Sequence, residues 1–442
     1  MFFLANKSLY KQDVLIYAYV FCMLFLFLAR NAFNIHFPVA LFILISSLPA
    51  IFGNNTNIIA VGLSCIPFST GFQYKYALFV CVLALIIKNR QRINLSRSAI
   101  FVFVMMLWEL LHFVCGDFSV IEFLRCFAEL LFFATVTCID FDEIDEKKIF
   151  RVFSLSVLGI CGIMLYIQMQ KYGFDLVSVF ARNNLKYRFG GMNSDALNFG
   201  LNFNSNSLGY ICNFSVMGMV MLIARKQNNK MDYALLLLSI LFGFSTLSRT
   251  FLVCLFSLFA LYIFSSIRDL KNVFKKIGLV LCIVGVIYII LLLFIPEIMQ
   301  GFSNRLNDSD LSNGRNELFY FYLNHIFSDP QYFLYGIGLQ DFQQKISMIY
   351  GFLQLVCHNG IEEVWVAWGI FGVLIFFGML VDMVHSSLKR DKSEIVLRVL
   401  PLFILILDSF AGQLIRSGVT MLSLAFVYVA LNARRTERSL LH

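Results

Sequence analysis

The segment VCHNGIEEVWVAWGIFG, residues 356–372, places a histidine and two glutamates directly before an uninterrupted apolar run. His358 precedes both Glu362 and Glu363 by about one helical turn. A neutral imidazole can accept a proton from a hydroxyl near neutral pH, and a carboxylate can hold the ring in place. The pattern therefore predicts a catalytic base, His358, oriented by Glu362 or Glu363. The structural alternative is that the glutamates begin a helix and the histidine only forms a hydrogen bond.

Four arginines are predicted to bind phosphate. Arg249 lies among hydroxyl residues in FSTLSRTFLVCLF, and Arg315 follows SNG at the start of an aromatic helical pattern. Arg416 in QLIRSGVT and Arg188 in ARNNLKYRFGG add positive charge on the same expected face. A planar guanidinium binds phosphate oxygens in pairs, so the set indicates a phosphate-rich ligand. The alternative is an ordinary surface arginine at Arg315 and a snorkelling anchor at Arg249.

Two further patterns suggest other kinds of site, a thiol nucleophile and a metal site, but in each case a structural explanation is favoured. Cys357 beside His358 suggests a thiol nucleophile, although adjacent side chains point in different directions. Asp308–Ser309–Asp310 has the DxD form of a metal site, which in a polar loop is more typical of a solvated turn. No CxxC pair, P-loop or dinucleotide fingerprint is present, so the sequence predicts neither a metal nor a cofactor.

Composition places these residues on a membrane protein. Hydrophobic residues make up 59% of the 442, charged residues only 14%, and the mean hydropathy is +0.78. Apolar blocks recur at about the 20-residue length that a helix needs to cross a bilayer. No cleavage site follows the first apolar run, so we expect it to remain as an anchor. The fold class predicted is an all-α, polytopic integral membrane protein.

About 14 transmembrane helices are predicted, and the third is the weakest because it is short and can instead be re-entrant. The expected spans are 14–30, 37–52, 57–70, 72–88, 98–115, 119–139, 149–170, 203–224, 231–247, 251–267, 277–295, 366–388, 395–412 and 417–432.

The short basic loops set the orientation. With 14 spans they all fall on one side together with both termini, and Lys/Arg-rich short loops are typical of the cytoplasmic side. The net charge of +8 then follows from topology and does not indicate nucleic-acid binding. Two long loops face the opposite side, where we expect the chemistry. The predicted division is 1–170, a first transmembrane bundle; 171–202, a periplasmic loop; 203–295, further spans; 296–365, the large periplasmic loop; and 366–442, the last spans and tail.

The ordered motifs on this outer face resemble those of the O-antigen polymerase/ligase superfamily, and most closely the Wzy-type polysaccharide polymerases. TLSRT at 246–250 is similar to the family's SRT turn between two spans. SNGR, then DPQYFLYGIGLQDF, resembles its SGR and GxG loop, and HNGIEEVWVAWGIFG resembles its HNxxxE entry into the next span. RFGGMNSDALNFGLNFNSNSLGY is a weaker match with a longer spacer, which puts Arg188 in doubt. The resemblance covers 188–372; the first 180 residues match in hydropathy alone.

This resemblance implies a GT-C-like membrane glycosyltransferase that joins saccharide repeat units carried on undecaprenyl pyrophosphate. The reaction implied is an inverting, metal-independent transfer on the periplasmic face of the bacterial inner membrane. Arg249 and Arg315 would hold the pyrophosphate and His358 would activate the acceptor. The partners implied are the undecaprenyl-pyrophosphate-linked oligosaccharide and membrane lipid, with a chain-length regulator protein as a further candidate.

Two alternatives stay open. An O-antigen ligase shares the scaffold but transfers the finished polymer to lipid A core. A flippase or transporter for lipid-linked saccharides would instead work through Glu122, Arg125 and Glu129, which share one face of a predicted span. The same three residues also fit an ion pair that only holds helices together.

Overall fold

In the computed structural model, 17 α-helices and one 3₁₀ turn account for nearly all of the described residues, and none of these residues is in a strand. The described residues are 2–69, 73–115, 120–173, 205–267, 269–296, 298–300, 303, 307, 315–339, 342–350, 357, 359–390, 395–410 and 418–432. The all-α prediction is confirmed for this part of the chain.

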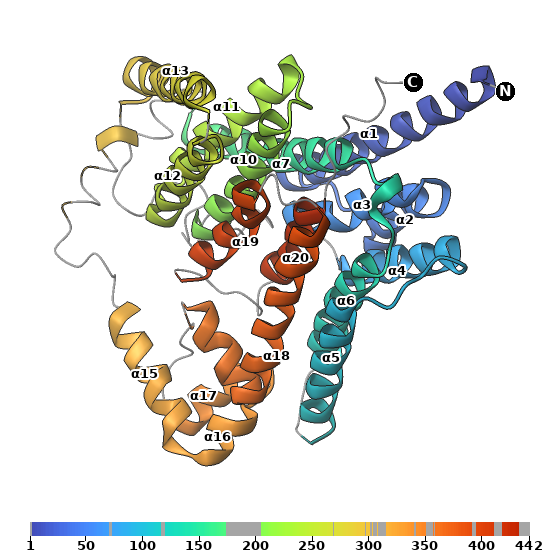
Figure 1. Ribbon diagram of the computed structural model, residues 1–442, viewed down its shortest axis with the longest axis vertical. Helices are drawn as coiled ribbons and strands as arrows, with labels where there is room; N and C mark the ends of the chain where they lie inside the picture. Colours follow the sequence, from blue (N-terminus) through green and yellow to red (C-terminus); the bar gives the residue numbers. More distant parts are fainter. Residues whose placement is uncertain are drawn as a thin grey trace.

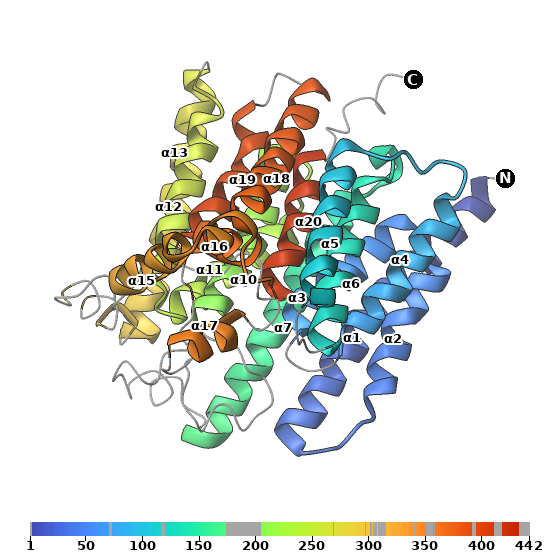
Figure 2. The ribbon, with the colours of Figure 1, turned by 90° about the horizontal axis from the view of Figure 1, so that it is seen from below.

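Each of the fourteen predicted spans coincides with a helix. These are α1 (Phe2–Phe33), α2 (Val39–Phe52), α3 (Asn55–Phe68), α4 (Lys75–Asn89), α5 (Arg97–Cys115), α6 (Val120–Thr137), α7 (Glu146–Tyr172), α10 (Ser205–Ala224), α11 (Lys230–Ser245), α12 (Arg249–Phe264), α13 (Leu270–Phe294), α18 (Gly360–Arg390), α19 (Ile395–Ser409) and α20 (Gly418–Asn432). Many of them run side by side in one bundle (Figure 2).

Six of the described helices are long and apolar enough to cross a membrane by length and composition: α1, α5, α7, α10, α13 and α18. Four shorter apolar helices lie in α2, α3, α12 and α20. The chain is thus a membrane-spanning helical protein, and the number of fourteen spans stays a prediction.

The weakest predicted span, α3, is an interior helix. Every residue from Thr56 to Phe68 is buried, and α3 packs against α4, α7 and α20. Asn54 caps it by accepting a hydrogen bond from the backbone N–H of Asn57 at 3.0 Å. Because protein surrounds α3, it does not need the length or apolarity of a helix that faces lipid.

The predicted large outer loop contains three helices, which lie together at the lower end of the molecule in Figure 1, and two of them pack against α18. They are α15 (Arg315–Ser328), α16 (Pro330–Tyr335) and α17 (Phe342–Tyr350). The helix predicted from NELFYFYLNHIF is confirmed as α15. Asp329 caps α16, with Pro330 at its first position, where a missing N–H costs nothing.

Glycines join α16 to α18 backbone against backbone. Gly336 and Gly369 have φ angles of +71° and +64°, and Gly369 breaks α18 into two helical pieces inside the predicted span 366–388. A Cβ on Gly369 would lie 2.2 Å from the carbonyl oxygen of Leu334, and one on Gly336 would lie 2.6 Å from Ala367. The N–H of Gly338 donates to the carbonyl of Ala367 at 2.7 Å. These glycines therefore fix the outer loop onto α18.

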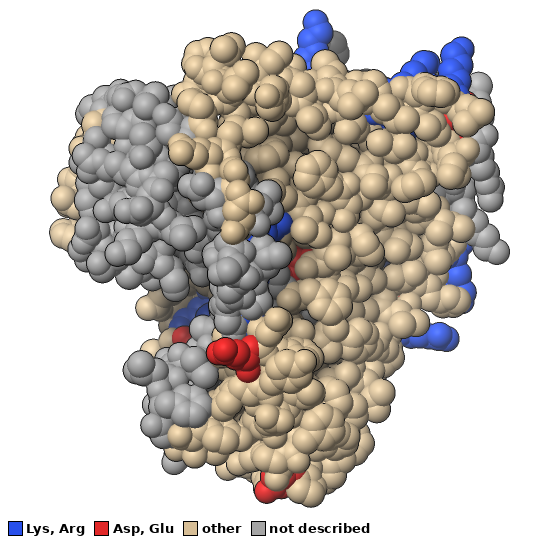
Figure 3. All heavy atoms as spheres, turned by 90° about the vertical axis from the view of Figure 1, so that its left-hand side faces the viewer, with Lys and Arg blue, Asp and Glu red and all other residues tan. Residues whose placement is uncertain are grey.

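One side of the molecule shows how little charge the surface carries. On the described part of that side, most of the charged atoms lie at the rims or beside the undescribed residues (Figure 3). The apolar α13 lies at the edge of the bundle with only Ile287 and Leu291 buried (Figure 1). Such a surface is suited to lipid contact.

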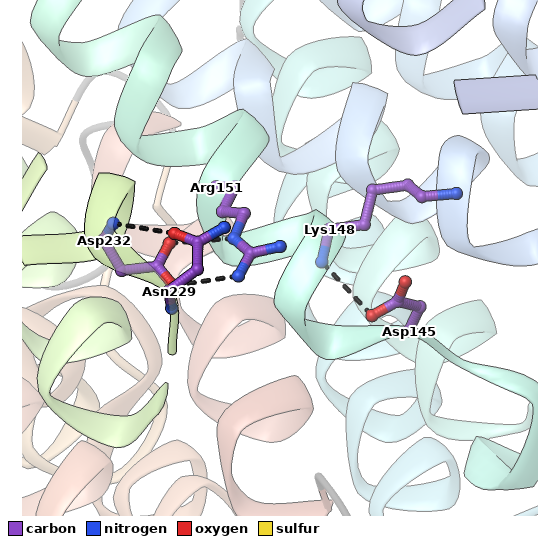
Figure 4. Close-up of polar contacts among 5 residues, drawn as sticks. All are labelled: Asp145, Lys148, Arg151, Asn229 and Asp232. Carbon is purple, nitrogen blue, oxygen red and sulfur yellow. Dashed lines mark hydrogen bonds and ion pairs between the residues drawn. The ribbon is translucent and has the colours of Figure 1, made fainter. Parts of the chain in front are cut away.

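On the side of the basic loops, a paired arginine and aspartate link α7 to α11 (Figure 4). Nε and Nη2 of Arg151 donate to the two carboxylate oxygens of Asp232, each at 2.8 Å. Asp232 is fully buried and also accepts from the backbone N–H of Asn229, completing a capping box at the start of α11. A two-pronged contact of this kind fixes both distance and orientation between the helices.

Asp232→Asn is expected to destabilise the protein by about 2–4 kcal/mol, because it leaves a largely buried guanidinium without its counter-charge while an amide can still cap the helix. Thermal unfolding in one detergent measures the loss. The matched control is Asp13→Asn, which breaks the more exposed pair between Lys148 and Asp13 and should cost less than about 1 kcal/mol. Equal losses from the two substitutions would contradict this assignment.

Candidate functional site

The turn between α11 and α12 positions Arg249. Leu247 adopts a φ of +51°, which reverses the chain after α11. Ser248 then caps α12 by accepting a hydrogen bond from the N–H of Phe251 at 3.3 Å. Arg249 is consequently the first residue of α12, with a half-buried side chain.

Hydroxyls beside this turn form local hydrogen bonds. Ser245 donates to the carbonyl of Leu241 at 2.9 Å, and Thr246 donates to that of Gly243 at 2.6 Å. They hold the turn from which Arg249 projects.

Arg315 is brought to the same place from the outer loop. It is the first residue of α15 and its side chain is half-buried. Burial lowers the pKa of the Arg315 guanidinium, and the positive charge of Arg249 lowers it further. The two arginines thus lie within electrostatic range although they are distant in sequence. Holding like charges together costs free energy, which a bound anion would offset.

The first turn of α18 carries the two predicted glutamates. Asn359 caps this helix, since its side-chain oxygen accepts from the N–H groups of Ile361 at 3.0 Å and Glu362 at 3.3 Å. Glu362 and Glu363 follow inside the helix, with 5% and 0% of their surface exposed. The N-terminal placement confirms the helix-start interpretation. The orienting role beside His358 stays a prediction, because His358 lies outside the described residues.

Cys357 is packed away under this helix start. Its thiol is fully buried, donates to the carbonyl of Asn359 at 3.3 Å and lies 3.8 Å from Oε2 of Glu362. Burial and the neighbouring Glu363 raise the pKa of the Cys357 thiol. A thiol held protonated and out of solvent is poorly suited to nucleophilic attack.

Asp408 is a buried acid that the sequence analysis did not single out. It is buried near the end of α19, and the amide of Asn213 on α10 donates to both of its oxygens at 3.3 Å. Tyr210 lies within electrostatic range of both Asp408 and Glu363. The signal was available, because an acid in the apolar run FILILDSF is costly unless it has a role.

His325 on α15 was also missed, since a single histidine within an aromatic helical segment has no distinguishing sequence pattern. It is 1% exposed, its Nδ1 lies 2.9 Å from the hydroxyl of Tyr350, and its ring stacks on Tyr332 at 4.5 Å between centroids. Burial lowers the pKa of His325 to about 4. The histidine is therefore neutral at physiological pH and joins α15, α16 and α17.

We expect acidification to lower the stability of the protein through protonation of His325. The pKa of His325 in the folded protein lies below the unfolded value of about 6.5. The stability that the neutral His325 contributes is therefore complete above about pH 6.5 and is lost as the pH falls towards about 4. We expect the Tm, followed from pH 7 downwards, to fall less steeply in His325→Asn than in the wild type. His36→Asn, at an exposed position, is the control and should titrate like the wild type. Identical slopes in all three proteins would refute this source of acid sensitivity.

Several predicted residues lie outside the described part of the chain: His358, Arg188, Arg416, Ser312 and the triplet 308–310. The structure thus places Arg249 and Arg315 within electrostatic range of each other, and Glu362 and Glu363 at the start of α18. Among the described residues, no group of three His, Cys, Asp or Glu side chains could hold a metal ion.

Comparison with known proteins adds no family assignment: no family model matches the chain, and no curated protein matches its sequence.

Proposed function

We propose that this chain is a surface-polysaccharide polymerase of the O-antigen type, acting on the periplasmic face of the bacterial inner membrane. The observation that carries the proposal is that Arg249, at a turn between two bundle helices, and Arg315, in the outer loop, lie within electrostatic range of each other. Fourteen spans, a GT-C-like arrangement and cytoplasmic termini belong to the same proposal. It rests further on the motif resemblance of residues 188–372.

The proposed reaction is an inverting glycosyl transfer. A hydroxyl of one lipid-linked repeat unit attacks the anomeric carbon of a growing glycan on undecaprenyl pyrophosphate. The new C–O bond forms as the bond to pyrophosphate breaks, and His358 accepts the hydroxyl proton. Arg249 and Arg315 stabilise the charge that develops on the leaving pyrophosphate, with Arg416 and Arg188 as further candidates. Glu362 or Glu363 orients His358.

The ligase alternative shares this chemistry and differs in its acceptor. For the transporter alternative, the relevant contacts are those of α6. Arg125 pairs with Glu122 at 2.7 Å, and the hydroxyl of Tyr74 on α4 donates to Glu129. The ion pair lies within α6, and the bond from Tyr74 joins the start of α4 to α6, so both favour a structural role for the three charged residues.

Deleting the gene in its host and separating the surface polysaccharide on a gel tests the proposal. A polymerase predicts loss of the ladder, with only single-repeat species remaining. Long polymer that is not attached to core would instead identify a ligase, and complete loss of surface glycan a flippase. An unchanged ladder would refute all three assignments.

A further inference from the structure

A cavity of about 740 Å³ opens on the outer side of the molecule, away from the two arginines. It lies between the outer end of α5, helix α16 and helix α17. Arg315 begins α15, whereas Tyr332 of the cavity follows its end, and a helix of this length extends about 21 Å. The cavity is therefore separate from the proposed pyrophosphate site.

Aromatic rings form the walls of the cavity, and contacts with neighbouring side chains and backbone hold these rings in position. Trp108 stacks near Tyr335 with centroids 6.1 Å apart and an interplanar angle of 27°. Nε1 of Trp108 donates to the carbonyl of Trp368 at 3.1 Å. The ring of His325 stacks on Tyr332 at 4.5 Å, so that ring is held too. Rigid rings lose little entropy when a ligand packs on them.

Polar groups lie among these rings. Gln331, His112 and Lys345 are lining residues with polar or charged side chains, and Nζ of Lys345 donates to the carbonyl of Ile337, also in the lining. His112 donates through Nε2 to the carbonyl of Tyr335 at 3.0 Å, which ties α5 to α16 at this point. Ligand sites commonly combine aromatic walls with a few such polar groups.

We propose that this cavity is a second saccharide-binding site, which holds part of the glycan away from the transfer centre. A pyranose presents an apolar C–H face that packs on an aromatic ring and a rim of hydroxyls that needs donors and acceptors. Tyr332 and Tyr335 supply the first, and Gln331, His112 and Lys345 supply the second. A hydrocarbon chain would pack on the rings but would use none of these polar side chains.

The choice of a glycan as occupant rests on the proposed function, although binding can be measured without any transfer reaction. The full chain, in nanodiscs free of glycoside detergent, is titrated with methyl glycosides of common hexoses and N-acetylhexosamines. Saturation-transfer difference NMR reports binding. We expect a signal from at least one glycoside, reduced about five-fold by Tyr335→Ala through loss of one stacking surface.

Two controls make the result specific. Tyr335→Phe keeps the ring and should bind like the wild type, and Tyr320→Ala removes a 64% exposed ring of α15 that does not line the cavity. Signals that are absent, or that none of the substitutions changes, would overturn the proposal. So would Tyr335-dependent binding of the fluorescent fatty acid cis-parinarate without glycoside binding, which would identify a hydrocarbon site.

The outcome also separates the two proposals. If no glycoside binds but the ladder still depends on Arg249, only the second saccharide site is refuted. If the protein binds glycosides but deleting its gene leaves the ladder unchanged, the proposed polymerase function is refuted and the saccharide-binding site is retained.

Discussion

Arg249→Ala is expected to reduce polymerisation by about 100- to 1,000-fold while the protein remains in the membrane at its normal level. The loss follows if Arg249 stabilises the charge on the leaving pyrophosphate, because one electrostatic donor of a transition state is worth about this much. Complementation of the deletion strain, with the glycan ladder read on a gel, measures it. Arg249→Lys keeps the charge but loses the two-pronged grip, so we expect an intermediate ladder.

Arg90→Ala is the matched control for charge, since Arg90 is exposed at the end of α4 on the opposite side. It should polymerise normally. Because Arg249 and Arg315 are proposed to hold one anion, the double alanine variant should lose little more than either single variant. A full ladder from Arg249→Ala, or fully additive losses in the double variant, would contradict a shared site.

Gly369→Ala is expected to destabilise the outer loop by roughly 3–5 kcal/mol and to abolish activity with it. The new Cβ would lie 2.2 Å from the backbone oxygen of Leu334, and the residue would have to keep a φ of +64°. Neither strain can be relieved by turning a side chain, since the contact is with the main chain. Limited proteolysis of purified protein should show early cleavage between α15 and α18.

Gly285→Ala is the control for this substitution. Gly285 lies within α13, where a Cβ meets nothing within 4 Å, and alanine favours a helix by up to about 1 kcal/mol. We expect this variant to match or slightly exceed the wild type in stability. Wild-type proteolysis of Gly369→Ala would show that α16 does not pack on the backbone of α18 in this way.

The sequence predicted the helices well, because hydropathy and length are local properties. All fourteen expected segments are helical, and α15 was found from its aromatic spacing. The break at Gly369 was not foreseen, since a glycine inside an apolar run has no distinguishing neighbour until Leu334 is placed against it. The burial of α3 depends in the same way on helices distant in sequence.

The site was predictable only in part. Residue type identified Arg249 and Arg315 as candidates, but their proximity depends on how the outer loop folds over the bundle. The sequence shows hydroxyl residues around Arg249, but only the geometry shows that those of Ser245 and Thr246 bond to the backbone of α11. Asp408 and His325 were missed because each gains its meaning from partners on other helices.

The most direct test is transfer by the purified protein. The full chain in nanodiscs is given one undecaprenyl-pyrophosphate-linked repeat unit, without any lipid A core, and the products are separated by mass. A polymerase predicts lipid-linked glycans of two and more repeats with release of undecaprenyl pyrophosphate, also when EDTA is present. Unchanged substrate from folded protein would contradict the proposed function, as would products that form only after lipid A core is added.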